Sequence, residues 1–373
     1  MNIIYEGQIP FYQFLNEHSQ VIQPLPEWAL TKETLINYYQ QMVIARQFDT
    51  KAIALQRTGQ LGTYASSAGC EAIDVVTASL MSEADVLVPY YRNHAMQMIR
   101  GMELSDILLY WGGDERGNSS PAQREDFPNC VPIATQCLHA CGVASAIKIR
   151  AQQRATVCML GDGATSKGDF LEALNVAGVW QLPVVFIINN NQWAISVPRS
   201  LQSIALTLAQ KALGAGIRGE QVDGNDVIAL HQSVASALQR AREGKGPTLI
   251  EAVSYRLSDH TTADDATRYR HPDALKTAWE KEPIKRLRNY LHAQGWWQEH
   301  NETEWQHQTA TLIQASVEQY LDTPPQPVSA MFDYLFADLP EHLVKQRDIA
   351  VSRDSGESSC NSNSSGNDRE AAS

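Results

Sequence analysis

Two short apolar runs separated by a helical stretch restrict the fold more than any other feature of the chain. The first run, residues 155–160, leads into Asp162, and the second, residues 183–188, leads into Asn191. Residues 169–180 between them have the pattern of a helix. Because a strand–helix–strand crossover is right-handed and leaves its strands parallel, Asp162 and Asn191 are predicted to meet at the carboxyl edge of one sheet.

This predicted edge has the composition of a magnesium site. Open parallel sheets bind ligands at the carboxyl ends of their strands. A carboxylate and an amide oxygen suit Mg²⁺, which prefers oxygen ligands and completes its octahedron with water and phosphate. The glycines beside Asp162 let the backbone approach a diphosphate, whose oxygens backbone N–H groups can bind. A Gly-Asp-Gly triplet alone also occurs in ordinary turns, so the pairing with Asn191 carries the interpretation.

Strand and helix patterns alternate through most of the chain. This alternation predicts an α/β fold, a doubly wound and mostly parallel sheet with helices on both faces and helical N- and C-terminal extensions. We expect an N-terminal arm over 1–30, the α/β domain with its C-terminal helices over 31–335, and a C-terminal segment over 336–373. From about residue 351 that segment has almost no apolar residues, which predicts disorder because it cannot bury enough surface to offset its ordering entropy.

The composition argues against several classes of partner. The formal net charge of −12 disfavours wide contact with nucleic acid or an anionic membrane, since both select basic surfaces. No apolar run has the length of a membrane span, and residues 1–10 do not resemble a secretion signal, so we expect a cytoplasmic location. Six cysteines form no CxxC pair. Cys137 and Cys141 lie one helical turn apart, but no second pair completes a zinc site, so both are interpreted as packing residues.

The Gly-Asp-Gly triplet followed one strand later by paired asparagines is the thiamine-diphosphate signature. The chain resembles the alpha subunit of the thiamine-diphosphate-dependent decarboxylating component of 2-oxo acid dehydrogenase complexes, of the bacterial pyruvate dehydrogenase type. Besides that signature, the likeness rests on GTYASSAGCEA (62–72), PYYRNHA (89–95), LYWGGDERGN (109–118), VPIATQ (131–136), VDGNDV (222–227), GPTLIEAVSYR (246–256) and DHTTADDATRYR (259–270). A nucleotide-binding α/β protein is disfavoured, because no GxxxxGK[ST] loop is present.

The resemblance implies where the cofactor and its metal ion bind. It assigns Mg²⁺ to Asp162, Asn191 and the backbone carbonyl of Trp193, with diphosphate oxygens and water completing the coordination. Further residues implied to contact the cofactor are Tyr91, Arg92, Val131, Ile133, Gly161, Gly163 and Ala164. A guanidinium suits such a site because its planar fork pairs two phosphate oxygens.

Other residues match positions with special roles in the family. Thr135 and Gln136 fall where some relatives bind a structural monovalent cation. His260 matches the active-site histidine, whose imidazole can orient the substrate carboxylate and exchange protons. Asp264 and Tyr269, with nearby charged residues, are expected to hold the His260 loop in shape. Thr261 follows the histidine where kinase-regulated relatives have serine, which makes phosphorylation control doubtful.

The resemblance also implies partners and a reaction. The family's glutamate that faces the cofactor's pyrimidine ring comes from a beta subunit, so we expect two alpha and two beta chains and no turnover by this chain alone. The predicted reaction is the decarboxylation of pyruvate with acetyl transfer to a lipoyl-lysine of the acyltransferase component. The alternatives are a branched-chain 2-oxo acid or acetoin dehydrogenase alpha subunit and, in another class, a non-catalytic structural paralogue that binds the cofactor.

Overall fold

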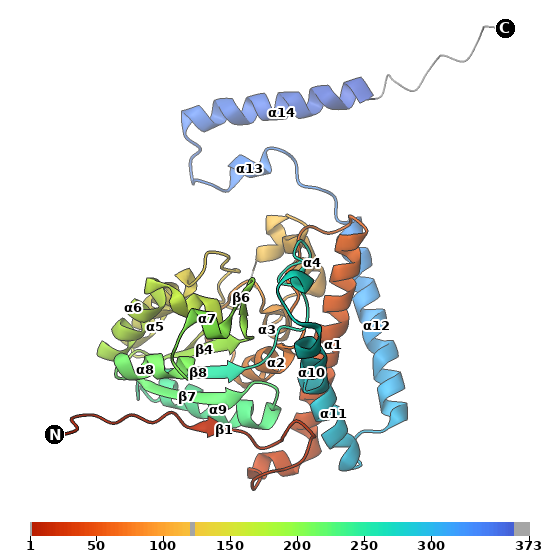
Figure 1. Cartoon of the computed structure of the whole chain (residues 1–373). Coiled ribbons are helices and arrows are strands. Elements are labelled where there is room, and N and C mark those ends of the chain that lie inside the picture. The colour runs from red at the N-terminus through yellow and green to blue at the C-terminus, as the bar shows by residue number, and fades with distance from the viewer. Residues whose placement is uncertain (1, 120–123, 362–373) are drawn as a thin grey trace. The chain divides into compact units, whose positions relative to one another are not determined.

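The computed structural model describes residues 2–119 and 124–361 and, of residues 355–361, the backbone alone. The chain separates into two compact units, residues 1–320 and 321–373. The boundary therefore falls earlier than the expected end of the α/β domain at residue 335. The first unit contains the whole sheet and its covering helices (Figure 1).

One parallel sheet of six strands runs through the first unit. The strands are β1 (Phe11–Tyr12), β2 (Val86–Val88), β3 (Thr156–Gly161), β4 (Val184–Asn190), β7 (Arg218–Asp223) and β8 (Thr248–Val253). Their order is β1-β7-β8-β4-β3-β2, and every neighbouring pair is parallel. Every residue of β4 is buried, as expected for a central strand covered on both faces. A separate antiparallel hairpin joins β5 (Trp193–Ala194) to β6 (Val197–Pro198).

Helices cover both faces of the sheet, which confirms the predicted fold class. On one face alternate strand residues join a core with α1 (Lys32–Arg57), α2 (Glu71–Leu80), α9 (Val227–Arg242) and α11 (Pro283–Ala293). On the other face they pack with α5 (Thr135–Ile149), α6 (Gly168–Val179) and α8 (Lys211–Gly214). The remaining helices of this unit include α3 (His94–Ile99), α4 (Leu104–Trp111), α7 (Arg199–Gln202) and α10 (Pro272–Glu280).

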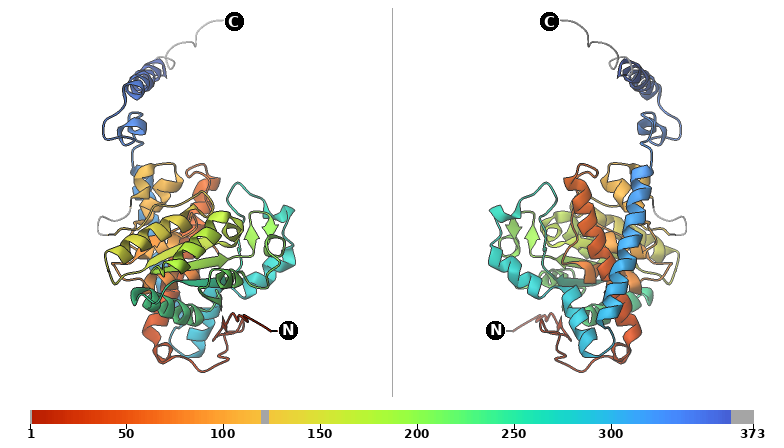
Figure 2. Two further views of the ribbon diagram at one scale, coloured as in Figure 1. Left: turned by 90° about the vertical axis from the view of Figure 1, so that its left-hand side faces the viewer. Right: turned by 90° about the vertical axis from the view of Figure 1, so that its right-hand side faces the viewer.

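Helix α12 (Glu299–Asp322) packs beside α1 (Figure 2). The indole of Trp305 donates to the Gln40 carbonyl at 3.2 Å, and the Tyr320 hydroxyl donates to the Gln60 carbonyl at 2.7 Å. The helical pattern expected after residue 280 is therefore present. No helix among the described residues is long and apolar enough to cross a membrane.

The N-terminal arm is part of the sheet of its own chain. Residues Phe11 and Tyr12 pair with Gln221 and Val222 and add β1 at the sheet edge. The Asp226 carboxylate then accepts hydrogen bonds from the backbone N–H groups of Phe14 and Leu15, at 2.6 and 2.8 Å. The sequence patterns indicate the N-terminal arm but give no signal for β1 or β7.

The second unit contains α13 (Ala330–Asp333) and α14 (Glu341–Asn361). Helix α14 continues through residues 351–361, where disorder was expected from composition. A helix satisfies its own backbone hydrogen bonds without burying an apolar face, so a polar sequence does not exclude it. The rest of the predicted disordered stretch, residues 362–373, lies outside the described residues.

Candidate active site

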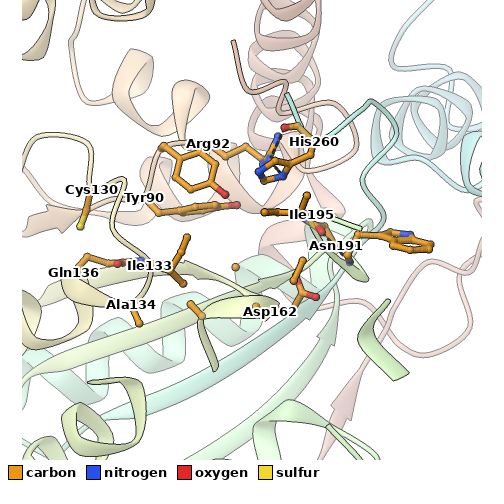
Figure 3. A pocket seen from close by; sticks show the side chains of 16 residues that line it. Tyr90, Arg92, Cys130, Ile133, Ala134, Gln136, Asp162, Asn191, Ile195 and His260 are labelled. Carbon is orange, nitrogen blue, oxygen red and sulfur yellow. Dashed lines mark hydrogen bonds between the residues drawn. The ribbon is translucent and has the colours of Figure 1, made fainter. Parts of the chain in front are cut away.

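The register of two central strands brings the predicted metal ligands together. Gly161 of β3 pairs with Asn189 of β4, so Asp162 and Asn191 leave neighbouring strands at the same carboxyl edge. Both side chains are buried, at 1% and 4% exposure. They line a cavity of about 220 Å³ (Figure 3). The juxtaposition expected from the crossover alone is therefore present.

Most of the residues predicted for the site line this one cavity. Its lining comprises Tyr90, Tyr91, Arg92, Cys130, Ile133, Ala134, Gln136, Gly161, Asp162, Gly163, Ala164, Asn191, Trp193, Ala194, Ile195 and His260. Val131 is not in the lining, and its side chain is 55% exposed. Thr135, at the start of α5, is also outside the lining.

The oxygen atoms at the sheet edge suit a hard divalent cation. Burial raises the pKa of Asp162, and a hydrogen bond from Gln202 Nε2 to Asp162 Oδ2, at 2.8 Å, opposes that rise. Asn191 Oδ1 accepts from the Trp193 backbone N–H at 3.2 Å, which ties the amide ligand to the carbonyl ligand predicted beside it. Among the described residues no group of three or more His, Cys, Asp or Glu side chains is placed so that it could hold a metal ion. A carboxylate with amide and carbonyl oxygens favours Mg²⁺ over softer metals.

Gly163 brings the turn after β3 against the β5–β6 hairpin. A Cβ placed on Gly163 would lie 2.7 Å from the Cβ of Ala194, closer than two carbon atoms pack. At Gly161 the nearest atom to such a Cβ is a ring carbon of Tyr90, 3.9 Å away. Only the second glycine of the triplet is therefore required by packing within this chain. At the first glycine, Gly161, a Cβ would enter open space at the cavity wall.

Three residues in or beside the cavity wall have a strained backbone. Gln192 and Ile195, on either side of Trp193 and Ala194, have φ values of 72° and 53°. Ala134, which precedes α5 on the opposite side, has φ of 69°. A β-branched side chain such as that of Ile195 rarely adopts this conformation, and such strain is typical of ligand-binding sites. These side chains gave no sequence signal, because glycine is the residue that normally marks a positive φ.

Arg92 joins the cavity to the histidine loop. The side chain is buried, and its guanidinium donates to the Ser66 carbonyl and, at 3.0 Å, to the His260 carbonyl. Its Nε is buried and has no hydrogen-bond partner among the described residues. An unpaired buried donor costs free energy, so an anionic group in the cavity would compensate it. The guanidinium also lies 5.6 Å from the centre of the Tyr91 ring.

His260 is neutral at pH 7. Burial lowers its pKa to about 4, and the nearby guanidinium groups of Arg92 and Arg256 contribute to the decrease. Arg92 Nη2 lies 3.3 Å from His260 Nδ1. Because arginine can only donate, Nδ1 is assigned as the acceptor and Nε2 carries the proton. An unperturbed imidazole would instead change charge near pH 6.5.

The predicted support of the His260 loop is confirmed. The Asp264 carboxylate accepts from the His260 backbone N–H at 2.9 Å and also from the Tyr269 hydroxyl. Arg256 donates to the same hydroxyl at 2.7 Å. A charged residue from the end of the sheet thus connects the loop to the rest of the site. Sequence reasoning had placed Arg256 in a family segment without giving it a role.

Arg256 also holds the backbone beside the proposed metal ligands. Its side chain is fully buried, and Nη2 donates to the Ile195 carbonyl at 2.9 Å. Nη1 lies 3.4 Å from the Trp193 carbonyl. The other residues that sequence reasoning missed are Tyr90, Cys130, Ala134, Ala194, Ile195 and Gln202. Several of them flank predicted residues directly, and that adjacency was the one available signal.

Gln136 has an unused acceptor in the cavity wall. Its Nε2 donates to the Met159 carbonyl at 3.0 Å, whereas its buried Oε1 has no hydrogen-bond partner among the described residues. An amide oxygen without a donor is a suitable ligand for a cation. This observation fits the monovalent cation expected at Thr135 and Gln136.

A protein-family model described as the dehydrogenase E1 component matches residues 39–329. The chain belongs to the dehydrogenase E1 component family. The 3-methyl-2-oxobutanoate dehydrogenase subunit alpha of Mycobacterium tuberculosis is 41% identical over 319 residues, which cover 86% of this chain and 87% of the relative. Pyruvate dehydrogenase E1 component subunit alpha of Staphylococcus epidermidis is 36% identical over 352 residues, covering 94% and 95%. The Staphylococcus aureus subunit of that name matches with the same identity and coverage.

Family membership confirms the general function that the sequence resemblance implied. The chain is the alpha subunit of a thiamine-diphosphate-dependent 2-oxo acid dehydrogenase component. An alpha subunit of this component implies a beta subunit as its partner. The two groups of relatives differ in the 2-oxo acid that their names state, so membership alone does not identify the substrate.

Proposed function

We propose that this chain, assembled with its beta partner, decarboxylates pyruvate and transfers the acetyl group to a lipoyl-lysine of an acyltransferase component. The observation that carries the choice of pyruvate is the extent of the match to pyruvate dehydrogenase alpha subunits. It covers 94% of this chain and 95% of the relative, so it includes the regions outside the cofactor fold. The reaction makes the protein an acetyl-transferring oxidoreductase.

A branched-chain 2-oxo acid is the second candidate substrate. It is favoured by the higher identity, 41%, to the alpha subunit of a 3-methyl-2-oxobutanoate dehydrogenase. The cavity in this chain does not discriminate between pyruvate and the branched acid, because this chain forms only part of the proposed pocket. An extra methylene in an apolar pocket changes binding by about 1–3 kcal/mol, so small changes in lining are enough to shift preference.

The described residues fit Mg²⁺ and thiamine diphosphate. Asp162, Asn191 and the Trp193 carbonyl would hold the metal ion at the sheet edge, where all three residues line the cavity. The diphosphate would lie along Gly161, Gly163 and Ala164, with Tyr91 and the unpaired Nε of Arg92 beside it. Ile133 would pack against the thiamine rings, and Val131 would do so through its backbone. When bound, thiamine diphosphate supplies the nucleophilic carbon and the electron sink for decarboxylation.

His260 orients the substrate and moves a proton in this proposal. Because its Nδ1 faces Arg92, its Nε2–H is the group that can donate to a substrate oxygen. A neutral imidazole can also take up a proton from the substrate as charge develops during the reaction. The buried position strengthens these hydrogen bonds, because the surroundings screen them less than water does. His260 would act again when the acetyl group passes to the lipoyl acceptor.

The active assembly is proposed to contain two alpha and two beta chains. The beta chain would contribute the glutamate that activates the cofactor, so the alpha chain by itself should be inactive. A monovalent cation at Thr135 and Gln136 would satisfy the unpaired Gln136 Oε1 and stabilise the start of α5. Its role would be structural.

The decisive experiment measures 2-oxo acid-dependent reduction of an artificial electron acceptor. The chain is co-purified with its beta partner and supplied with thiamine diphosphate and Mg²⁺, and pyruvate is compared with 3-methyl-2-oxobutanoate. A clear preference for pyruvate in kcat/KM supports the proposal, whereas preference for the branched acid assigns the protein to the second candidate. Absence of activity with both acids, despite cofactor binding, would contradict a catalytic role on either substrate.

A further inference from the structure

Gln202 contacts the proposed metal ligand Asp162 from a different segment of the chain. It is the last residue of α7, which follows the β5–β6 hairpin. Gln202 Nε2 donates to Asp162 Oδ2 at 2.8 Å and to the Val197 carbonyl at 3.2 Å. Among the described residues no other side chain donates to the Asp162 carboxylate. The backbone N–H groups of Asp162 and Gly163 also donate to it, but they belong to its own turn, so Gln202 is the one side chain that orients this carboxylate from another segment.

The hydrogen bond between Gln202 and Asp162 is buried, so water has little access to replace it. Asp162 is 1% exposed, and the Oε1 atom of Gln202 is buried without a hydrogen-bond partner among the described residues. Burying an unpaired amide oxygen is unfavourable unless the rest of the side chain makes a stronger interaction. Donation to an ionised carboxylate is such an interaction, because hydrogen bonds to charged groups are about twice as strong as neutral ones.

The segment that carries Gln202 is fixed on both sides. The Arg199 backbone N–H donates to the Gln192 carbonyl at 2.9 Å, and Arg199 Nη1 donates to the Ser203 carbonyl at 2.7 Å. A Cβ on Gly163 would lie 3.8 Å from Gln202 Oε1, so the amide packs beside the turn that contains Asp162. The amide is therefore held in place before any ligand binds.

We propose that Gln202 is a positioning residue for the divalent cation. By binding Oδ2 it fixes the carboxylate and leaves Oδ1 of Asp162 as the oxygen available to the metal ion. Gln202 itself does not touch the metal or the substrate. The inference rests on the proposed metal site at Asp162. Residues that orient a metal ligand in this way typically change metal affinity by about 10- to 100-fold when removed.

The test compares Gln202→Met with Ser200→Ala in the complex with the beta partner, stripped of cofactor and metal. Methionine keeps the length of the side chain and removes the donor. Ser200 is exposed on the same helix and serves as the matched control. Mg²⁺ is titrated at a fixed thiamine diphosphate concentration, and binding is followed by tryptophan fluorescence, since Trp193 lines the cavity.

We expect the apparent Kd for Mg²⁺ to rise about tenfold or more in Gln202→Met and to stay unchanged in Ser200→Ala. Excess Mg²⁺ should then restore full thiamine diphosphate binding to Gln202→Met, because only the orientation of Asp162 is impaired. An unchanged Kd in this variant would overturn the proposal. Loss of cofactor binding that no Mg²⁺ concentration restores would also overturn it, since that indicates a general structural role.

Asp162→Ala separates this inference from the proposed metal site. If that variant loses Mg²⁺ dependence while Gln202→Met titrates normally, only the role of Gln202 is wrong. If Asp162→Ala itself binds Mg²⁺ and thiamine diphosphate normally, the metal site is wrong.

The contact also couples the metal site to an exposed apolar segment. Leu201 is 78% exposed, and Ile204 and Leu206 are fully or almost fully exposed. Because coupling between two sites is reciprocal, Mg²⁺ and thiamine diphosphate should slow backbone hydrogen exchange over residues 199–203. The slowing should be smaller in Gln202→Met than in the unsubstituted protein. Equal protection in the two proteins would contradict the coupling.

Discussion

The two walls of the active-site cavity are built in different ways. On one wall, Asp162 and Asn191 follow the buried strands β3 and β4, whose backbone register places them side by side. On the opposite wall, Arg92 and His260 lie on loops and are held by side-chain hydrogen bonds (Figure 3). We call the first the sheet wall and the second the loop wall. In the proposed function, the sheet wall binds the cofactor's metal ion and the loop wall acts on the substrate.

Removing the carboxylate of the sheet wall should have the largest effect. Asp162→Ala deletes the one charged ligand proposed for Mg²⁺, so we expect Mg²⁺-dependent binding of thiamine diphosphate to be abolished. Isothermal titration of the complex with the beta partner measures this. Unchanged cofactor affinity would show that the sheet wall does not bind the metal ion.

Removing the imidazole of the loop wall should separate catalysis from binding. We expect His260→Ala to keep its thiamine diphosphate affinity and to lower acetyl transfer to a lipoyl acceptor by about 10²- to 10⁴-fold. Both quantities are measured on the same purified complex. If His260→Ala weakened cofactor binding as strongly as Asp162→Ala, the assignment of metal binding to the sheet wall and of catalysis to the loop wall would be wrong.

The two glycines of the triplet provide a matched pair on the sheet wall. Gly163→Ala places a Cβ 2.7 Å from that of Ala194, so we expect a loss of about 1–3 kcal/mol in the free energy of unfolding. Gly161→Ala meets nothing closer than 3.9 Å and should cost much less. Thermal unfolding of the cofactor-free complex measures both, without interference from the diphosphate. A similar loss in the two variants would argue against the close packing of the hairpin.

Changing pH should have the smallest effect. With the pKa of His260 lowered to about 4, the imidazole stays neutral as the pH falls from 7 to 5.5. The ratio of acetyl-transfer rates between the unsubstituted protein and His260→Ala should then change by less than about twofold. A group with the ordinary pKa of about 6.5 would be mostly protonated at pH 5.5, and the ratio would fall about tenfold. That larger decrease would show that the loop wall is less buried in the assembled enzyme.

The sheet wall was predictable from the sequence to a large extent. Apolar runs of strand length, each followed by polar residues, identified β3 and β4, and the handedness of the crossover implied that Asp162 and Asn191 meet. The loop wall had no such signal, because hydrogen bonds such as that between Arg92 and His260 join residues distant in sequence. Only the family resemblance indicated those residues, and nothing indicated Gln202.

The sequence by itself determined the fold class, the family, and the chemistry of the predicted cation ligands. Those properties follow from periodicity, chain direction and residue type, which are local or depend on neighbouring elements. Only the tertiary structure decided that Val131 lies outside the cavity, that β1 pairs with β7, and that His260 stays neutral. These properties depend on burial and on contacts between remote segments, and the order of residues along the chain does not report either.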